Sequence, residues 1–248
     1  MIDTHAHLQG LDGGPGAAIE EAAAAGVDRI VCVGDSPELA QEAIELARSH
    51  PGVVATAGLH PHRAELWDAG VRARLDELLE DPAVVAVGEC GLDYYRERAG
   101  RAAQAAAFAV QVELSERHGK ALVIHTREAA NDTLDVLRQT AAAVVLHCFS
   151  LPEHLDEASE RGWYASFAGN VTYPSATELA AAAARVPEHL LLLETDCPYL
   201  SPVPYRGKPN RPQYVLETLR FVAGLRGVAP EQLAEQVAAN AARVFART

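Results

Sequence analysis

Two histidines close to the amino terminus, His5 and His7, are the first residues whose type and spacing suggest chemistry. They lie in a short run, residues 1–8, that is followed by several turn-forming glycines. If the run is a strand, side chains two residues apart share a face, so both imidazoles can bind one ion. Neutral histidine is the commonest protein ligand of transition metals. A His-X-His pair alone is nevertheless more often structural, so the pair needs support from the rest of the chain.

Length and composition indicate a globular α/β protein. The chain has 248 residues, of which 49% are hydrophobic and 22% are charged. A (β/α)8 barrel commonly has about 250 residues in one domain, so this length fits one barrel. The formal net charge of −13 argues against a broad, non-specific grip on DNA, but it leaves room for a local group of arginines.

Cysteine usage and hydropathy indicate a cytoplasmic setting. The four cysteines form no CxxC pair, so we expect reduced thiols rather than disulfides. We expect no signal peptide, because no apolar run of sufficient length follows the amino terminus. No window approaches the roughly 20 apolar residues that cross a membrane. Nothing in the sequence indicates an obligate protein partner.

Strand-like and helix-like patterns alternate from end to end. Strands are predicted over residues 1–8, 28–33, 53–59, 84–88, 121–125, 143–147, 164–167 and 190–194. Helices are predicted over residues 17–26, 37–49, 65–79, 101–118, 129–139, 152–161, 175–185, 213–225 and 230–246, with Ser36 as the N-cap of the second. Eight strand–helix pairs favour a single-domain (β/α)8 TIM barrel over residues 1–248, with an extra C-terminal helix. An open, doubly wound sheet is the alternative.

Polar residues follow the apolar runs of several predicted strands. In a (β/α)8 barrel the reacting groups lie at the carboxyl ends of the strands. Taken singly, each such residue is best read as a hydrogen-bonded histidine or a capping carboxylate, but six of them at one rim are hard to explain in that way. The six residues are His5, His7, Glu89, His125, His147 and Asp196.

These six side chains suffice for two divalent ions if one carboxylate bridges them. Glu89 is the bridging candidate, because no lysine occupies the end of the fourth strand. Two ions about 3.5–4 Å apart can hold both the attacking and the leaving oxygen of a displacement. The pattern therefore predicts one or two divalent ions per chain.

Seven motifs, spread in order over nearly the whole chain, carry a resemblance to a known family. They are DTHAHL at 3–8, GLHPH at 58–62, GECGLDY at 88–94, IHTR at 124–127, LHCFS at 146–150, ETDCPYL at 194–200 and PYRGKPN at 204–210. Together they resemble the TatD family of metal-dependent hydrolases, which have an amidohydrolase-like barrel.

The resemblance implies a ligand set and an activity. It implies that one ion is bound by His5, His7, Glu89 and Asp196, and a second by Glu89, His125 and His147. The activity best described for the family is magnesium-dependent deoxyribonuclease action, including 3′-to-5′ exonuclease cleavage of single strands. Arg211 stands where an acidic residue often follows the loop asparagine, which leaves the choice of substrate open.

The expected reaction is attack of a metal-activated water on a phosphodiester, with DNA as the first candidate substrate. Asp196 is the expected general base, and Glu89 is expected to act with it at the metals. Histidine-rich ligation suits zinc or manganese by ligand softness, whereas the resemblance points to magnesium. Hydrolysis of an ester, lactone or amide is the alternative activity, and a non-catalytic metal-binding barrel is the alternative from another class.

A second set of residues has two readings each. His60 and His62 follow the third strand. They are expected either to contact substrate or orient ligands, or to be surface histidines. Glu194 is in phase with Asp196 and orients a ligand or water, or it is a buried carboxylate held by its neighbours. Three basic residues are candidates for phosphate contact: Arg127, Arg206 and Lys208. Alternatively, Arg127 forms an ion pair at the barrel mouth, and Arg206 and Lys208 belong to a solvated loop.

Overall fold

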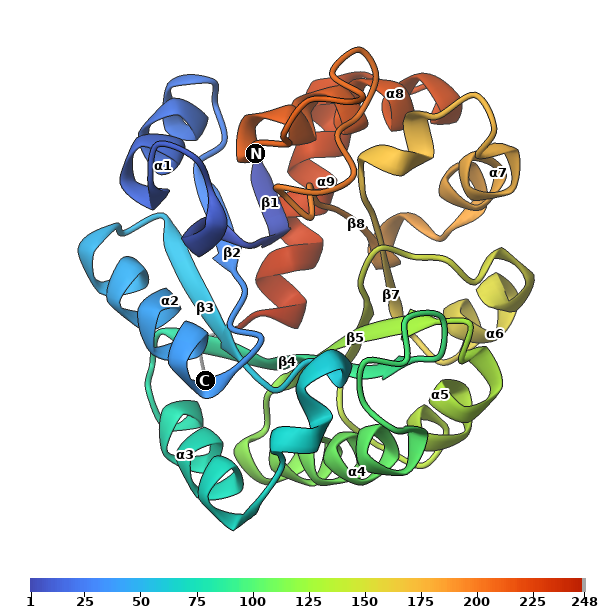
Figure 1. Ribbon diagram of the computed structural model, residues 1–248. Helices are drawn as coiled ribbons and strands as arrows, with labels where there is room; N and C mark the ends of the chain where they lie inside the picture. Colours follow the sequence, from blue (N-terminus) through green and yellow to red (C-terminus); the bar gives the residue numbers. More distant parts are fainter. Residues whose placement is uncertain (247–248) are drawn as a thin grey trace. The chain divides into compact units, whose positions relative to one another are not determined.

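The structure is a computed structural model that describes residues 1–246, in which strands and helices alternate along the chain (Figure 1). The strands are β1 (Ile2–Ala6), β2 (Arg29–Cys32), β3 (Val53–Ala57), β4 (Val84–Asp93), β5 (Ala121–Arg127), β6 (Val144–Leu146), β7 (Tyr164–Phe167) and β8 (Leu191–Leu193). The α-helices are α1 (Pro15–Ala24), α2 (Pro37–Ser49), α3 (Ala69–Leu79), α4 (Arg101–His118), α5 (Ala130–Leu137), α6 (Leu155–Glu160), α7 (Thr177–Arg185), α8 (Val215–Arg226) and α9 (Pro230–Val244).

The eight strands form one sheet in the order of the sequence, from β1 to β8. A parallel bridge between Ala6 and Cys197 then joins the first strand to the segment that follows the last. A sheet that returns to its first strand in this order is that of a (β/α)8 barrel, so the predicted fold class is confirmed and the open sheet is excluded. The predicted extra helix is α9.

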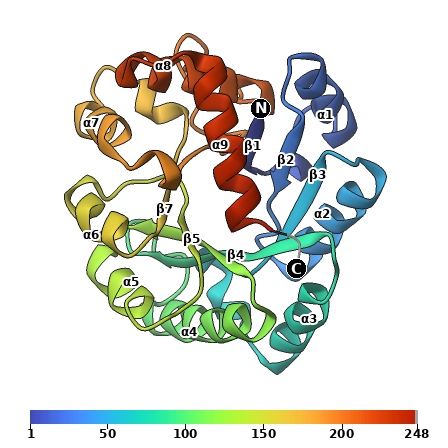
Figure 2. The ribbon, with the colours of Figure 1, turned by 180° about the vertical axis from the view of Figure 1, so that it is seen from behind.

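The chain divides into two compact units, each discontinuous in sequence. Unit 1 comprises Met1–Cys32 and His147–Val244, and it carries β7, β8, β1 and β2. In unit 1, α9 packs against β1 and β8 (Figure 2). Unit 2 contains Val33–Leu146 and carries β3 to β6, with α4 packed on β4. The single domain expected over residues 1–248 stays a prediction.

Local signals explain where two of the helices begin. The Ser36 hydroxyl accepts a hydrogen bond from the backbone N–H of Leu39, which confirms Ser36 as the N-cap of α2. The predicted helix over 65–79 is too long at its start, because α3 begins only at Ala69. Asp68 caps α3 by accepting from the N–H of Val71 at 2.8 Å. The preceding residues form a separate 3-10 helix, η2 (Pro61–Leu66).

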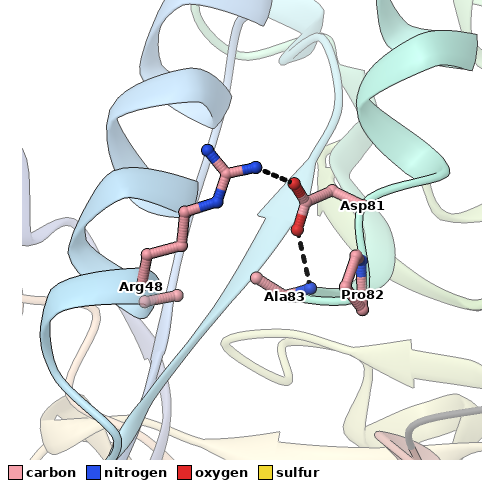
Figure 3. Close-up of a pocket in the computed structure, with 5 residues that line it drawn as sticks. Arg48, Asp81, Pro82 and Ala83 are labelled. Carbon is pink, nitrogen blue, oxygen red and sulfur yellow. Dashed lines mark hydrogen bonds and ion pairs between the residues drawn. The ribbon is translucent and has the colours of Figure 1, made fainter.

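A small surface pocket of about 230 Å³ lies in unit 2 beside the start of β4. Its lining includes Arg48, from α2, whose guanidinium donates to the Asp81 carboxylate (Figure 3). The same carboxylate accepts from the N–H of Ala83 at 2.8 Å. None of the predicted site residues lines this pocket, which lies at the end of β4 away from Glu89. Its contacts tie α2 to the turn before β4.

No helix among residues 1–246 is long and apolar enough to cross a membrane.

Candidate metal centre

In unit 1, three predicted ligands come together around the ends of β1 and β8. The Nε2 atoms of His5 and His7 lie 3.8 Å and 3.4 Å from Oδ1 of Asp196. Ligand atoms of all three residues lie within 4.8 Å of one another. The Asp196 side chain is mostly buried. Burial raises its pKa, but the hydrogen bond from His7 and the nearby histidines outweigh this and leave the pKa below its ordinary value.

Strand alternation alone does not explain how His5 and His7 meet. β1 ends at Ala6, so His7 lies just beyond the strand rather than in it, as the sequence reading assumed. The register of β1 against β2 also shifts between Asp3 and Ala6, which marks a bulge around His5. Bulges are common next to active sites because they redirect a side chain.

A buried carboxylate, Asp3, fixes β1 to the segment that carries Asp196. One oxygen accepts from the N–H of Thr195 at 2.9 Å and from the N–H of His5 at 3.3 Å. The other accepts from the Thr195 hydroxyl. Burial raises the pKa of Asp3 to about 8, although the hydrogen bonds from Thr195 lower it. The sequence reading did not single out Asp3, although its charge within a buried strand was the available signal.

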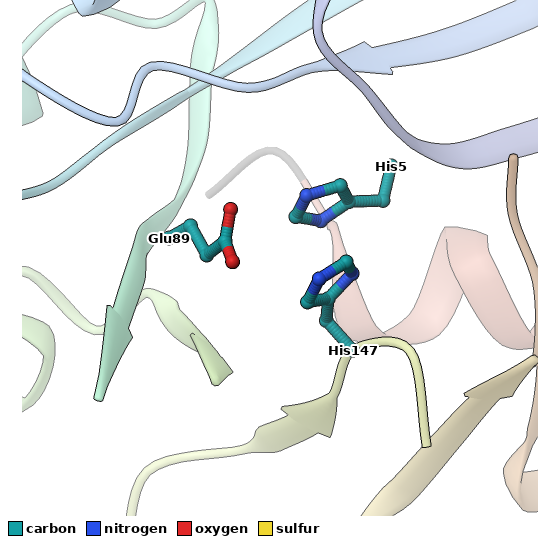
Figure 4. Close-up of side chains that lie close together, drawn as sticks. All are labelled: His5, Glu89 and His147. Atoms are coloured by element: carbon teal, nitrogen blue, oxygen red, sulfur yellow. The ribbon is translucent and has the colours of Figure 1, made fainter. Parts of the chain in front are cut away.

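His147 lies against His5, with ring centroids 3.6 Å apart and planes inclined by 18° (Figure 4). Its Nδ1 is 2.8 Å from Oε1 of Glu194, which is fully buried. The same oxygen accepts from the N–H of Cys148 at 2.7 Å. Carboxylates hydrogen-bonded to metal-binding histidines commonly set the orientation of the ring. Glu194 thus contacts His147 directly, and its orienting role stays a prediction.

In unit 2, Glu89 is the centre of a second group. Its Oε1 lies 2.8 Å from Nδ1 of His125 and 3.4 Å from Nε2 of His60. Ligand atoms of the three residues lie within 4.8 Å of one another. Glu89, whose carboxylate extends from β4 in Figure 4, is only 2% exposed.

A bulge and a glycine place Glu89 within β4. The strand runs on to Asp93, so the predicted strand end at residue 88 is wrong. Between Val87 and Cys90, the register against β5 shifts by one residue. Gly91 has a φ of +134°, and a Cβ there would lie 2.1 Å from the carbonyl oxygen of His125. Only glycine permits this close approach of β4 to β5.

Asp93, at the end of β4, contacts two of the neighbouring histidines. Its Oδ2 is 2.8 Å from Nε2 of His62 and 3.1 Å from Nε2 of His125. Its Oδ1 accepts from the N–H groups of Tyr95 and Arg96 at 3.0 Å and 2.8 Å. Burial raises the Asp93 pKa, but the hydrogen bonds from His125, Arg96 and His62 outweigh it and hold the pKa well below its usual range.

Asp93 lies in the GECGLDY motif at 88–94, but the sequence predicted no role for it. The available signal was its position four residues after Glu89, in phase along one strand. His62 also has a lowered pKa, caused first by burial and then by the neighbouring His60, so its neutral form is favoured.

Comparison with known proteins identifies the family of the chain. A family model described as "TatD related DNase" matches residues 2–246. The chain belongs to the TatD family. The resemblance seen in the sequence motifs is therefore confirmed, and the protein is a metal-dependent hydrolase by family.

Relatives of full length support the same membership. The "Uncharacterized metal-dependent hydrolase TatD" of Mycobacterium tuberculosis is 39% identical, over 99% of this chain and 97% of its own. The "3′-5′ ssDNA/RNA exonuclease TatD" of Erwinia billingiae is 36% identical, over 92% of this chain and 91% of its own. The crystal structure of YjjV, a TatD homologue from Escherichia coli K12, has 27% identity and a TM-score of 0.92, covering 99% of this chain and 97% of that one.

The donor atoms of this TatD protein fit a divalent cation. The unit 1 group offers two imidazole nitrogens and a carboxylate, and so does the unit 2 group. Sets of this kind bind zinc, manganese and similar ions. The residues present therefore agree with the expected cofactor, whereas the identity and number of ions stay predictions.

The basic residues expected at the substrate lie in two places on the TatD chain. The Arg127 guanidinium lies 3.9 Å from the centre of the Tyr95 ring, and both side chains are exposed. Arg206 lies 4.4 Å from the centre of the Tyr173 ring, and Lys208 is exposed in the same loop. Arg127 is two residues from His125, so it is the basic residue closest in sequence to a ligand.

Proposed function

We propose that this TatD-family hydrolase cleaves phosphodiester bonds and shortens single-stranded DNA from its 3′ end. The observation that carries the proposal is the presence of two groups of side chains that could hold a metal ion, His5–His7–Asp196 and His60–Glu89–His125, each built from imidazoles and one carboxylate. The name of the Erwinia relative, a 3′-5′ single-stranded DNA and RNA exonuclease, supports this substrate class.

The proposed ligand assignment follows the family. His5, His7 and Asp196 bind one ion, His125 and His147 bind the second, and Glu89 serves both. When bound, divalent ions act as Lewis acids and lower the pKa of water, so that hydroxide is available at neutral pH. Glu194 orients His147 through the 2.8 Å contact with its Nδ1.

Asp196 is proposed as the general base that accepts the proton of the attacking water. Its Oδ1 faces His5 and His7, and it lies between the buried segment of β8 and the following loop. A carboxylate with a second oxygen can bind through one atom and accept a proton at the other.

Arg127 and Tyr95 are proposed to contact the nucleotide next to the bond that is cleaved. A base can stack on an exposed aromatic ring, and an arginine can pair with a phosphate. Both side chains are exposed. Tyr95 follows β4, the strand that carries Glu89, and Arg127 ends β5, the strand that carries His125. His62, Arg206 and Lys208 are proposed as further substrate contacts. With a net charge of −13, the protein should contact few phosphates.

The proposal is tested with 5′-labelled single-stranded oligonucleotides after chelation and re-addition of magnesium, manganese or zinc. We expect stepwise shortening from a free 3′ end, and none when that end is blocked. A panel of esters, lactones and amides is assayed in parallel. Cleavage of the panel without cleavage of DNA would replace the proposal with the carbonyl alternative, and no turnover of either would favour a non-catalytic metal-binding protein. The cytoplasmic location stays a prediction.

A further inference from the structure

In unit 1 an exposed aromatic ring, that of Tyr199, lies beside the group formed by His5, His7 and Asp196. Its centroid is 6.1 Å from that of the His7 imidazole, and the two ring planes are inclined by 74°. Such a contact covers at most one face of the tyrosine ring. Because Tyr199 is 60% exposed, its remaining surface is open to solvent. A single exposed apolar side chain is common, so exposure by itself does not indicate a binding site.

The backbone at Tyr199 is held in place by buried contacts. Its N–H donates to the carbonyl of Asp196 at 2.9 Å, and its carbonyl accepts from the side-chain amide of Asn210. Asn210 is fully buried, and its amide also donates to the carbonyl of Thr195 at 2.8 Å. The next residue, Leu200, has a φ of 53°, a left-handed conformation that is uncommon outside glycine and gathers at functional sites. The Tyr199 ring is therefore presented on a fixed backbone, so a ligand does not have to order the loop.

Three other tyrosine rings of unit 1 are covered by side chains of the protein itself. Tyr205 and Tyr214 stack on each other, with centroids 3.9 Å apart and planes inclined by 4°. The guanidinium of Arg206 lies 4.4 Å from the centre of the Tyr173 ring. Tyr199 differs from these three, because its ring meets only the neighbouring His7 among residues 1–246. Its open face is therefore available to a planar ligand.

The loop between β8 and α8 also carries positive charge. Arg206 and Lys208 are exposed and form no ion pair with a carboxylate in the described part of the chain. In a protein with a net charge of −13, two such cations in one loop favour an anionic ligand. An anion that also carries a planar, uncharged ring is a nucleotide. Nucleobases stack on aromatic side chains with little dependence on their identity, because every base has a π-face.

We propose that the Tyr199 ring stacks on a nucleobase of the substrate next to the unit 1 ligand group, and that it accepts any of the bases. The inference rests on the proposed function for its substrate class. It adds a base-binding residue in unit 1 to Tyr95 in unit 2.

The test compares two ligands that differ in the presence of the base, 2′-deoxyadenosine 5′-monophosphate and 2-deoxyribose 5-phosphate. Their affinities for the magnesium-loaded protein are measured by isothermal titration, without turnover. We expect the wild type to bind the nucleotide about 5- to 150-fold more tightly than the sugar phosphate, which is the range of base–aromatic stacking. Tyr199→Ala should lower this ratio at least about fivefold, with little change in the affinity for the sugar phosphate.

Tyr199→Phe should keep the wild-type ratio, because the ring and not the hydroxyl makes the stack. Val203→Ala is the matched control, because it removes an exposed apolar side chain from the same loop without removing a ring. We expect the wild-type ratio in this variant. If Tyr199→Ala fails to fold, Tyr199→Leu serves in its place, because leucine keeps apolar volume but has no aromatic face.

Three results would overturn the proposal: no preference of the wild type for the nucleotide, an unchanged ratio in the folded Tyr199→Ala or Tyr199→Leu protein, or loss of the preference in Tyr199→Phe. Equal weakening of both ligands in Tyr199→Ala leaves the ratio unchanged, so it counts against base stacking and indicates a structural role. A base preference that depends on Tyr199, in a protein that does not cleave DNA, would contradict the proposed function and leave this inference standing.

Discussion

Asp196 lies close to both histidines of the unit 1 group. It faces Nε2 of His7 at 3.4 Å and Nε2 of His5 at 3.8 Å, and its φ of 54° places it in the left-handed region. Such a conformation in a residue other than glycine is uncommon, and these conformations gather at functional sites. The backbone therefore agrees with a chemical role for this carboxylate.

We predict that Asp196→Asn loses turnover but keeps most of its metal. The amide retains an oxygen ligand but cannot accept the proton of the attacking water, and loss of a general base typically costs about 10²–10⁴-fold in rate. Turnover and bound metal are measured on the same purified sample, with the exposed Asp12→Asn as the control. Near-normal turnover would assign the base elsewhere, and joint loss of turnover and metal would leave Asp196 as a ligand only.

Tyr95, which is 57% exposed beneath Arg127, is predicted to bind a base of the substrate. Stacking on an aromatic ring contributes about 1–3 kcal/mol per base, so Tyr95→Ala should raise KM about 5- to 150-fold and leave kcat nearly unchanged. The control is Leu225→Ala, which removes another exposed apolar side chain, on α8. An unchanged KM with single-stranded DNA would contradict the placement of the base.

For single residues, the sequence indicated which side chains could bind a metal ion, but it did not indicate all of their hydrogen-bond partners. His125 and His147 were identifiable because each follows an apolar run, and His5 because it forms a His-X-His pair with His7; both patterns are local in sequence. The partnership of Asp93 with His62 and His125 depends on ring orientations and on where β4 ends, neither of which a single sequence specifies. The contacts of Asp3 were not predictable either, because its partner Thr195 is 192 residues away in the sequence.

At the scale of elements, α4 supports the unit 2 group through two buried glutamines. The Gln104 side chain accepts from the N–H of Asp93 at 2.8 Å and donates to the carbonyls of Asp93 and Ala99. Gln111 makes the same pair of contacts with the backbone of Leu59. These bonds satisfy backbone groups just where β4 ends and where the chain leaves β3 toward His60.

We predict that Gln104→Met destabilises the protein. Methionine is of similar length but leaves the buried N–H and C=O of Asp93 without their partner, and each such group costs about 1–3 kcal/mol. The free energy of unfolding is measured by urea titration, with the exposed Gln139→Met as the control, which should stay within about 0.5 kcal/mol of the wild type. Equal stability of the two variants would show that the Gln104 contacts contribute little.

The bounds of α4 were predictable, and its function was not. The run of strong helix formers and Gly119, which has a φ of +62° at the C-cap, predict residues 101–118 correctly. Helix propensity does not report that buried glutamines of this helix bond to distant strand ends. The bulges of β1 and β4 were missed for a similar reason, because they are set by pairing with β2 and β5.

At the scale of the whole molecule, each of the two units supplies one ligand group of three residues. An ion that binds the folded chain and not the unfolded one stabilises the fold, by about 2.7 kcal/mol at a concentration 100 times its Kd. We therefore predict one to two divalent ions per chain, and a melting temperature that falls on chelation and recovers on re-addition. Metal content is measured by mass spectrometry of protein purified without chelator. A metal-free protein with an unchanged melting temperature would contradict the ligand assignment.

The fold class was predictable because it needs only the order and type of elements. Alternation of strands and helices over the chain gave the (β/α)8 order, which the β1-to-β8 sheet confirms. The substrate is not predictable in this way, because it depends on exposed loops, such as the one with Arg206 and Lys208, rather than on the ligand positions.

Metal-dependent hydrolysis of a phosphodiester is tested most directly by the cleavage of a 5′-labelled single-stranded oligonucleotide with chelated and with reconstituted protein. We predict that chelated protein is inactive and that re-addition of a divalent ion restores stepwise shortening from the 3′ end. Added salt should reduce the rate only weakly, because few phosphates are contacted. Undiminished cleavage by exhaustively chelated protein, or no cleavage with magnesium, manganese or zinc, would contradict the claim.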